Sequence, residues 1–196
     1  MKNKILVTCF EPFGGESFNA SAAVCEAMPE SIAGISMEKM TLPVEFCRAA
    51  HLAASRARAL GAGLIVSLGE ARGRKAVTPE LLAINLNHAS IPDNMGAMPQ
   101  DEPIAKEGAA AYFTKFPARS LAENIKARGV PSALSYSAGA YVCNDLYYRL
   151  LCEFEGSGTS VIFIHIPRSE ERENYRNIAL AISNAIEDII YKENSN

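Results

Sequence analysis

Short runs of hydrophobic residues alternate along this chain with longer stretches in which hydrophobic positions recur every three or four residues. Most of the short runs are apolar at successive positions, which is typical of strands buried on both faces of a parallel sheet. The pattern predicts strands at Lys4–Thr8, Met37–Leu42, Leu64–Leu68, Leu82–Asn87, Ala133–Tyr136 and Val161–Ile166.

The longer stretches have the spacing of amphipathic helices. A glycine follows two of them, at Gly61 and Gly129, where it is typical of a helix end. The predicted helices are Ser21–Met28, Glu45–Leu60, Ser120–Arg128, Asn144–Phe154 and Glu170–Tyr191. Strands that alternate with helices in this way predict an α/β fold, with a mostly parallel twisted central sheet and helices on both faces. Residues 87–107, rich in Pro, Asn, Asp and Gly, are expected to form a long loop that serves as a lid or a subunit contact.

Composition narrows the class of protein. The 196 residues are 48% hydrophobic and 21% charged, and they show no repeat or break in composition, so we expect one domain over residues 1–196. A net charge of -3 with interspersed signs gives no basic surface for nucleic acid or an anionic membrane. The first apolar run is too short for a signal peptide, so a cytoplasmic protein is expected. Five cysteines without CxxC spacing indicate neither a disulfide framework nor a metal site.

One cysteine stands apart from the others. Cys143 follows a turn-like segment, Ser137-Ala-Gly-Ala-Tyr-Val, and directly precedes a predicted helix that Asn144 or a near neighbour could cap. Free N–H groups at a helix start favour a thiolate, and a histidinium nearby would bring the thiol pKa from about 8.5 to roughly 7 or below. Cys143 is therefore a candidate nucleophile. Cysteines within helical patterns are expected to be structural, and these are Cys25, Cys47 and Cys152.

Two further residues complete a candidate triad. His165 ends an apolar strand, where the sites of open α/β sheets gather, whereas His51 and His88 suit solvated or structural roles. Glu80, in Thr-Pro-Glu, would orient the imidazole of His165. The alternatives are a buried structural histidine and a solvated carboxylate at the start of a helix or strand.

The segment Phe10-Glu-Pro-Phe13-Gly-Gly follows the first strand. It lacks GxGxxG spacing and a P-loop lysine, so we expect no nucleotide site there. Phe10 and Phe13 could wall a small apolar pocket, or could simply fill the core.

With these residues in view, the chain resembles the pyroglutamyl peptidase I family, the pyrrolidone-carboxylate peptidases, nearly from end to end. The resemblance rests on several motifs in order: Cys9-Phe-Glu-Pro-Phe-Gly-Gly15, Val77-Thr-Pro-Glu80, Ile91-Pro-Asp-Asn94, Ser137-Ala-Gly-Ala-Tyr-Val-Cys143-Asn144 and Phe163-Ile-His165-Ile-Pro167.

This resemblance implies a cysteine peptidase that hydrolyses the N-terminal pyroglutamyl residue from peptides through a thioester. It implies that Cys143 is the nucleophile, His165 the general base and acid, and Glu80 the residue that orients His165. The substrate residues implied are Phe10 and Phe13 around the pyroglutamyl ring, with the backbone near Glu70 and the side chains of Ile91 and Val142 completing the pocket. The family also implies an α/β/α sandwich, no cofactor and, often in bacteria, a homotetramer.

The chain departs from the usual family pattern at four positions. Cys9 replaces a glycine, Glu70 and Arg72 interrupt a Gly-Gln-Ala-Gly-Gly-Arg motif, and Ser90 stands where an arginine usually precedes Ile-Pro-Asp-Asn. Losing a cation that supports an oxyanion can cost on the order of 100-fold in rate. One hypothesis is that a cation after the third predicted strand compensates; the candidates are Arg72, Arg74 and Lys75. The alternatives are a related amidohydrolase with another substrate, and a weakly active or inactive homologue that acts in binding or assembly.

Overall fold

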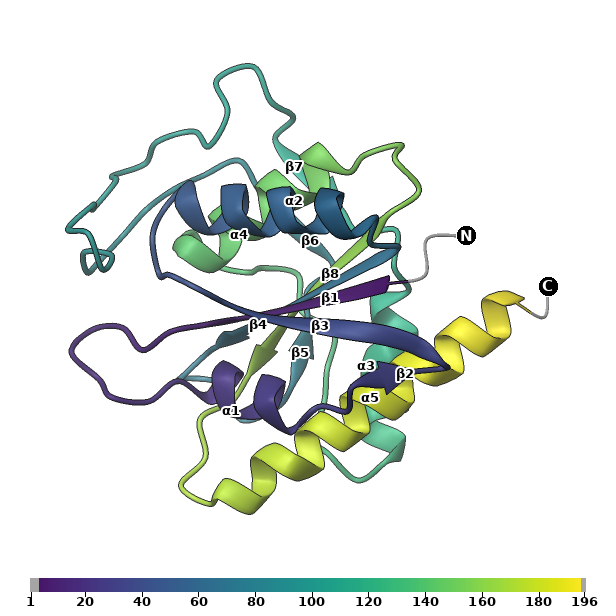
Figure 1. Cartoon of the computed structure of the whole chain (residues 1–196). Coiled ribbons are helices and arrows are strands. Elements are labelled where there is room, and N and C mark those ends of the chain that lie inside the picture. The colour runs from purple at the N-terminus through teal and green to yellow at the C-terminus, as the bar shows by residue number, and fades with distance from the viewer. Residues whose placement is uncertain (1–3, 195–196) are drawn as a thin grey trace.

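The computed structural model describes residues 4–194, and a six-stranded sheet lies at its centre (Figure 1). Its strand order is β2-β3-β1-β4-β8-β5, in which β3, β1, β4 and β8 are parallel and the two edge strands are antiparallel. The strands are β1 (Lys4–Phe10), β2 (Ser31–Ile32), β3 (Ile35–Leu42), β4 (Leu64–Glu70), β5 (Thr78–Pro79) and β8 (Ser160–Ile166). A separate antiparallel pair joins β6 (Leu82–Ile84) to β7 (Ala111–Phe113).

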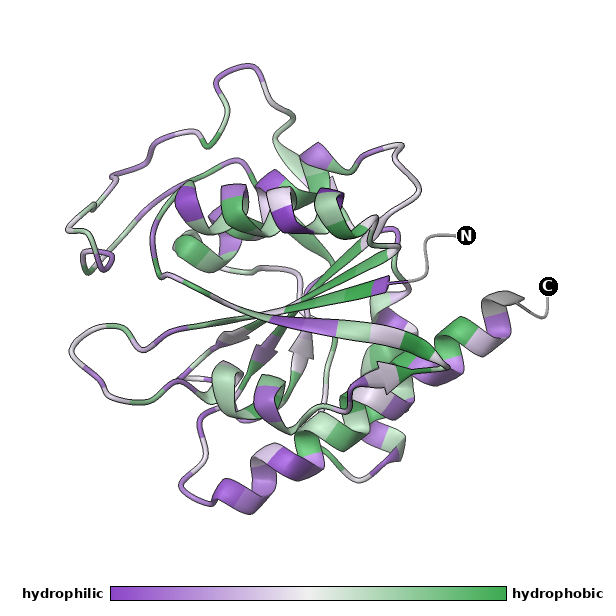
Figure 2. Cartoon of the chain, in the orientation of Figure 1, coloured by the Kyte–Doolittle hydropathy of each residue, from purple (hydrophilic) through white to green (hydrophobic). Residues whose placement is uncertain are grey.

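Helices cover both faces of the sheet. One face carries α2 (Arg48–Leu60) and α4 (Val142–Glu153), and the other carries α1 (Ala20–Ala27), α3 (Ala118–Ala127) and α5 (Arg172–Asn194). Successive β1 side chains point to opposite faces, so that Ile5 and Val7 enter the core under α1 and α5 while Leu6 enters the core under α2 and α4. The central strands are accordingly apolar over most of their length (Figure 2). The expected α/β/α sandwich is confirmed.

One strand prediction holds only in part, and another was wrong. Leu82–Asn87 yields only the short β6, which lies outside the central sheet. Residues 133–136 form no strand, although the N–H groups of Ala133 and Ser135 donate to the carbonyls of Val77 and Pro79. The N–H groups of Val77 and Leu81 donate in return to the carbonyls of Pro131 and Ser135, so the two segments pair through isolated parallel bridges and not through a continuous strand. The partner strand β5 is only two residues long, which leaves no hydrophobic period to detect in the sequence.

The parallel strands bring the candidate chemistry to one edge. β1, β4 and β8 end at Phe10, Glu70 and Ile166, and the register places Gly69 beside His165. Helix α4 starts next to this edge, because a Cβ placed on Gly69 would lie 3.0 Å from Sγ of Cys143. Within the described residues, no helix is both long and apolar enough to cross a membrane.

Candidate active site

Cys143 is the second residue of α4, which begins at Val142. The first N–H groups of a helix have no intrahelical acceptor, and the backbone N–H of Cys143 lowers the pKa of its thiol. The side chain of Asn144 does not cap this helix, contrary to the expectation. It instead accepts from the N–H of Ile84 at 3.0 Å and donates to the carbonyls of Ile84 and Leu86, both at 2.9 Å, which fixes α4 against β6.

The thiol pKa also differs from the expectation. Burial raises the pKa of Cys143 to about 12, and the charge of Glu80 acts in the same direction, while Arg74 and the backbone N–H lower it. Desolvation therefore outweighs the helix start. These surroundings disfavour the thiolate, although the side chain of Cys143 is only half-buried.

His165 and Glu80 form a buried pair. Nδ1 of His165 lies 2.7 Å from Oε1 of Glu80, and the two residues are 5% and 0% exposed. Burial lowers the pKa of His165, and this exceeds the opposing effect of the hydrogen bond and charge of Glu80; Arg74 lowers the pKa further. The imidazole is thus neutral near pH 7, with Nδ1 bound to the carboxylate and Nε2 left for chemistry. His51 and His88 are both exposed, and His88 lies 3.0 Å from Asp101.

Arg74 contacts the same carboxylate. Its Nη1 donates to Oε1 of Glu80 at 2.5 Å and also to Oγ1 of Thr78, and its Nη2 donates to the carbonyl of Ser137 at 2.8 Å. The guanidinium therefore joins Glu80 to the segment that leads into α4. Lys75 and Ser90, by contrast, are exposed.

A small pocket opens beside Cys143 and His165. Its volume is about 140 Å³, below the ~300–1,000 Å³ of sites for drug-sized ligands. Four of the expected substrate residues line it: Phe10, Phe13, Glu70 and Val142. Sequence reasoning missed the other lining residues, which are Asn19, Val44, Ala138 and Tyr141. Tyr141 directly precedes Val142, and its place at the start of the helix could have identified it as a pocket residue from the sequence.

Ile91 is placed differently. It is 42% exposed and is not among the residues that line the pocket, but its Cδ1 would contact a Cβ on Gly14 at 3.8 Å. It therefore lies beside the turn that follows Phe13. Tyr141 connects the same region to the long loop, since its hydroxyl donates to the carbonyl of Pro92 at 3.0 Å.

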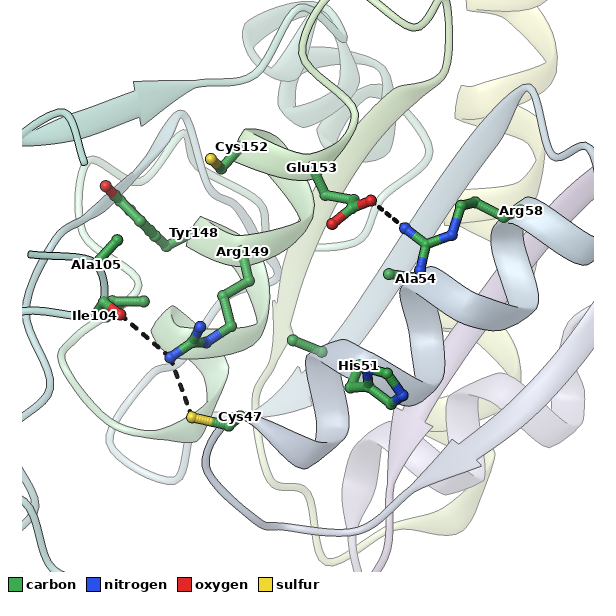
Figure 3. Close-up of a pocket in the computed structure, with 11 residues that line it drawn as sticks. Cys47, His51, Ala54, Arg58, Ile104, Ala105, Tyr148, Arg149, Cys152 and Glu153 are labelled. Atoms are coloured by element: carbon green, nitrogen blue, oxygen red, sulfur yellow. Dashed lines mark hydrogen bonds and ion pairs between the residues drawn. The ribbon is translucent and has the colours of Figure 1, made fainter. Parts of the chain in front are cut away.

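A second pocket, of about 380 Å³, lies between α2 and α4, away from the candidate triad (Figure 3). Cys47 and Cys152, which were expected to be structural, border it with exposed side chains, whereas Cys25 is buried. Arg149 donates to Sγ of Cys47 at 3.1 Å and to the carbonyl of Ile104 at 3.3 Å. Its guanidinium is therefore hydrogen-bonded to other groups of the protein.

Comparison with known proteins decides the family. The model of the pyroglutamyl peptidase family matches residues 3–187. The chain belongs to this family. It is 40% identical over 166 residues to pyrrolidone-carboxylate peptidase 2 of Caldanaerobacter subterraneus subsp. tengcongensis, which covers 84% of this chain and 81% of the relative. The pyrrolidone-carboxylate peptidase of Levilactobacillus brevis is also 40% identical, with the same coverage.

Solved structures agree with this assignment. Pyroglutamyl peptidase I of Bacillus amyloliquefaciens superposes with a TM-score of 0.85 at 36% identity, covering 94% of this chain and 97% of that one. Pyrrolidone carboxyl peptidase of Pyrococcus furiosus gives a TM-score of 0.89 at 31% identity, covering 96% and 99%. The expected family and fold are both confirmed.

Proposed function

We propose that this member of the pyroglutamyl peptidase family removes the N-terminal pyroglutamyl residue from peptides by acyl transfer through Cys143. The observation that carries the proposal is the shared pocket: Cys143 and His165 border the same small cavity, and Glu80 holds His165 from behind. A nucleophile, a base and a group that orients the base are the parts that acyl transfer through a thioester requires.

Acylation starts from the neutral pair. As the Cys143 thiol attacks the carbonyl carbon of the pyroglutamyl residue, its proton passes to Nε2 of His165, and Glu80 stabilises the imidazolium that forms. Backbone N–H groups at the start of α4 receive the oxyanion. The tetrahedral intermediate then collapses: the C–N bond breaks, His165 gives the proton to the leaving amine, and a thioester remains on the sulfur.

Deacylation uses the same groups. His165 takes a proton from water, whose oxygen attacks the thioester carbonyl. The C–S bond breaks, the proton returns to the sulfur, and pyroglutamate leaves with the enzyme restored. These steps require no cofactor.

The pocket suits a small lactam. Phe10 and Phe13 supply apolar walls, and Val142 lies at the base of the helix that carries the nucleophile. An ordinary amino terminus would have to lose the hydration of its ammonium group to enter, which is costly without a partner. The neutral pyroglutamyl ring avoids that cost, so peptides with N-terminal pyroglutamate are the proposed substrates.

The proposal includes a cytoplasmic location and a homotetramer, which rest on the composition and on the family resemblance. Size-exclusion chromatography with light scattering measures the oligomeric state. A monomer at micromolar concentration would contradict the tetramer.

Trapping the acyl-enzyme tests the chemistry. Wild-type protein mixed with a pyroglutamyl amide and quenched in acid should carry one pyroglutamyl group on the peptide that contains Cys143. Mass spectrometry locates the group, and the Cys152→Ala variant, which lacks the exposed thiol on the same helix, is the matched control. Acylation of another residue, or none in a protein that turns over, would contradict the mechanism.

A further inference from the structure

Four charged residues form a closed ring beside the pocket. The carboxylate of Glu16 accepts from Nη1 of Arg72 on one oxygen and from Nη2 of Arg168 on the other, both at 3.1 Å. Both guanidiniums also approach Oε1 of Glu70, Arg72 at 2.9 Å and Arg168 at 3.6 Å. The charges alternate around the ring and cancel.

Glu70 is the buried member of the ring and the only one that lines the pocket among the described residues. Its side chain is fully buried, and its second oxygen, Oε2, accepts from the backbone N–H of Ala20 at 2.7 Å. Both oxygens are therefore engaged. Without its cations, the buried carboxylate would strongly attract a positive charge in the pocket, because the protein interior screens the negative charge poorly.

The ring also joins three separate segments. Glu16 belongs to the loop between β1 and α1, Glu70 and Arg72 lie at the end of β4, and Arg168 follows β8. Arg72 stacks over the ring of Phe13 at 5.0 Å. Phe13, on the same loop as Glu16, forms one wall of the pocket, so the ring fastens this wall to the ends of the two central strands.

We propose that this charge ring determines specificity: it holds the Phe13 loop over the pocket and neutralises Glu70, so that the site accepts a neutral lactam and rejects a charged amino terminus. The inference rests on the proposed function. Glu16, Arg72 and Arg168 act as positioning residues, because their contacts are with the loop and with Glu70.

The ring also explains why two departures from the usual family motif occur together. Glutamine at position 70 could still accept from Ala20, but its amide N–H would face the N–H groups of Arg72. Glu70→Gln alone therefore creates a conflict between donors, and Arg72→Ala alone leaves the Glu70 carboxylate with only the more distant Arg168. The double variant removes both problems, so the two substitutions should be strongly non-additive.

The test compares Arg72→Ala, Glu70→Gln and the double variant with a pyroglutamyl amide and a prolyl amide, whose ring nitrogen is positively charged. Arg72→Ala should raise KM for the pyroglutamyl amide roughly fivefold or more, with the larger change in KM than in kcat. It should also raise the relative kcat/KM for the prolyl amide. The double variant should regain much of the pyroglutamyl selectivity, because no carboxylate is left at position 70, while KM stays raised because Arg72 no longer holds the Phe13 loop. Arg176→Ala, which removes an exposed ion pair on α5, is the control and should match wild type.

Hydrogen exchange of residues 11–19 provides a readout that does not depend on turnover. The loop amides should exchange faster in Arg72→Ala and in Arg168→Ala than in wild type, while α3 is unchanged. KM, selectivity and loop exchange at wild-type values in the variants would overturn the ring proposal, and so would purely additive effects of Glu70→Gln and Arg72→Ala. Absence of pyroglutamyl turnover in wild type would instead overturn the proposed function, and faster loop exchange in the variants would still show that the ring holds the loop.

Discussion

Oε1 of Glu80 lies 2.7 Å from Nδ1 of His165, whereas Oε2 of the same carboxylate has no hydrogen-bond partner among the described residues. A buried carboxylate oxygen without a donor is costly and is typically retained only where function requires it. One oxygen thus contacts the imidazole, and the unpaired oxygen carries a cost in stability.

Glu80→Gln should leave the fold intact and lower kcat on the order of 10²–10⁴-fold, because an amide can donate to Nδ1 and favour the wrong tautomer. KM should change little, since Glu80 lies behind His165. Steady-state kinetics with the pyroglutamyl amide measure both constants, and thermal unfolding verifies the fold. Glu123→Gln, an exposed glutamate on α3, is the matched control. Activity within about threefold of wild type would contradict the orienting role of Glu80.

Arg74→Ala should reduce kcat/KM by roughly tenfold or more, because the guanidinium bonds Glu80 and lowers the pKa of both His165 and Cys143. In wild type the His165 pKa lies below its ordinary 6.5, so kcat/KM should fall with acid only below that pH. Without Arg74 the His165 pKa rises, and this acid limb should move to higher pH.

The matched variants are Arg72→Ala and Lys75→Ala, the other two cations that could stand in for the missing family arginine. Lys75 is exposed and should have no effect, whereas Arg72→Ala should alter KM without moving the acid limb. Unchanged turnover and an unchanged acid limb in all three variants would refute compensation by any of these cations.

Alkylation by iodoacetamide reports the state of Cys143 in the free protein. Burial raises the thiol pKa, so alkylation of Cys143 near pH 6 should be no faster than that of the exposed Cys47, and it should still be increasing with pH at pH 9. Peptide mapping after short exposures measures each rate. Fast, selective alkylation of Cys143 at pH 6 would show a preformed thiolate and contradict the neutral pair.

Gly69→Ala tests how closely α4 approaches the sheet. The added Cβ would lie 2.7 Å from Cζ of Phe163 and 3.0 Å from Sγ of Cys143, so one of these groups must move. We expect a loss of about 1–3 kcal/mol in the free energy of unfolding and a larger proportional loss of kcat than of KM. Denaturant unfolding and kinetics check this; Gly73→Ala, with open space at its Cβ, is the control. Equal behaviour of the two variants would contradict the close approach.

Much of the fold could be read from the sequence because the central strands are continuous apolar runs and the helices have clear spacing. The parallel arrangement also explains why Cys143 and His165 could be paired in advance, since strand ends and helix starts meet at one edge. The short edge strand β5 and the pairing of residues 133–135 with it could not be predicted, because segments of two or three residues are too short to show a hydrophobic period.

The thiol pKa and the charge ring could not be predicted from the sequence for a different reason. The helix start favours a thiolate, but the degree of burial that opposes it depends on packing against Gly69 and Phe163. Glu70 and Arg72 are two residues apart, but Glu16 lies in the loop between β1 and α1 and Arg168 lies in the loop between β8 and α5. Only the assembled sheet edge brings them together.

The most direct test of the central claim is release of a fluorescent amine from a pyroglutamyl amide, comparing wild type with Cys143→Ala and with a prolyl amide as the control substrate. The account predicts turnover that is selective for the pyroglutamyl amide and is abolished in Cys143→Ala. Turnover that persists in Cys143→Ala, or no turnover by a folded wild type, would contradict it. The second result would make Ser90→Arg the next variant and favour an altered substrate or an inactive homologue.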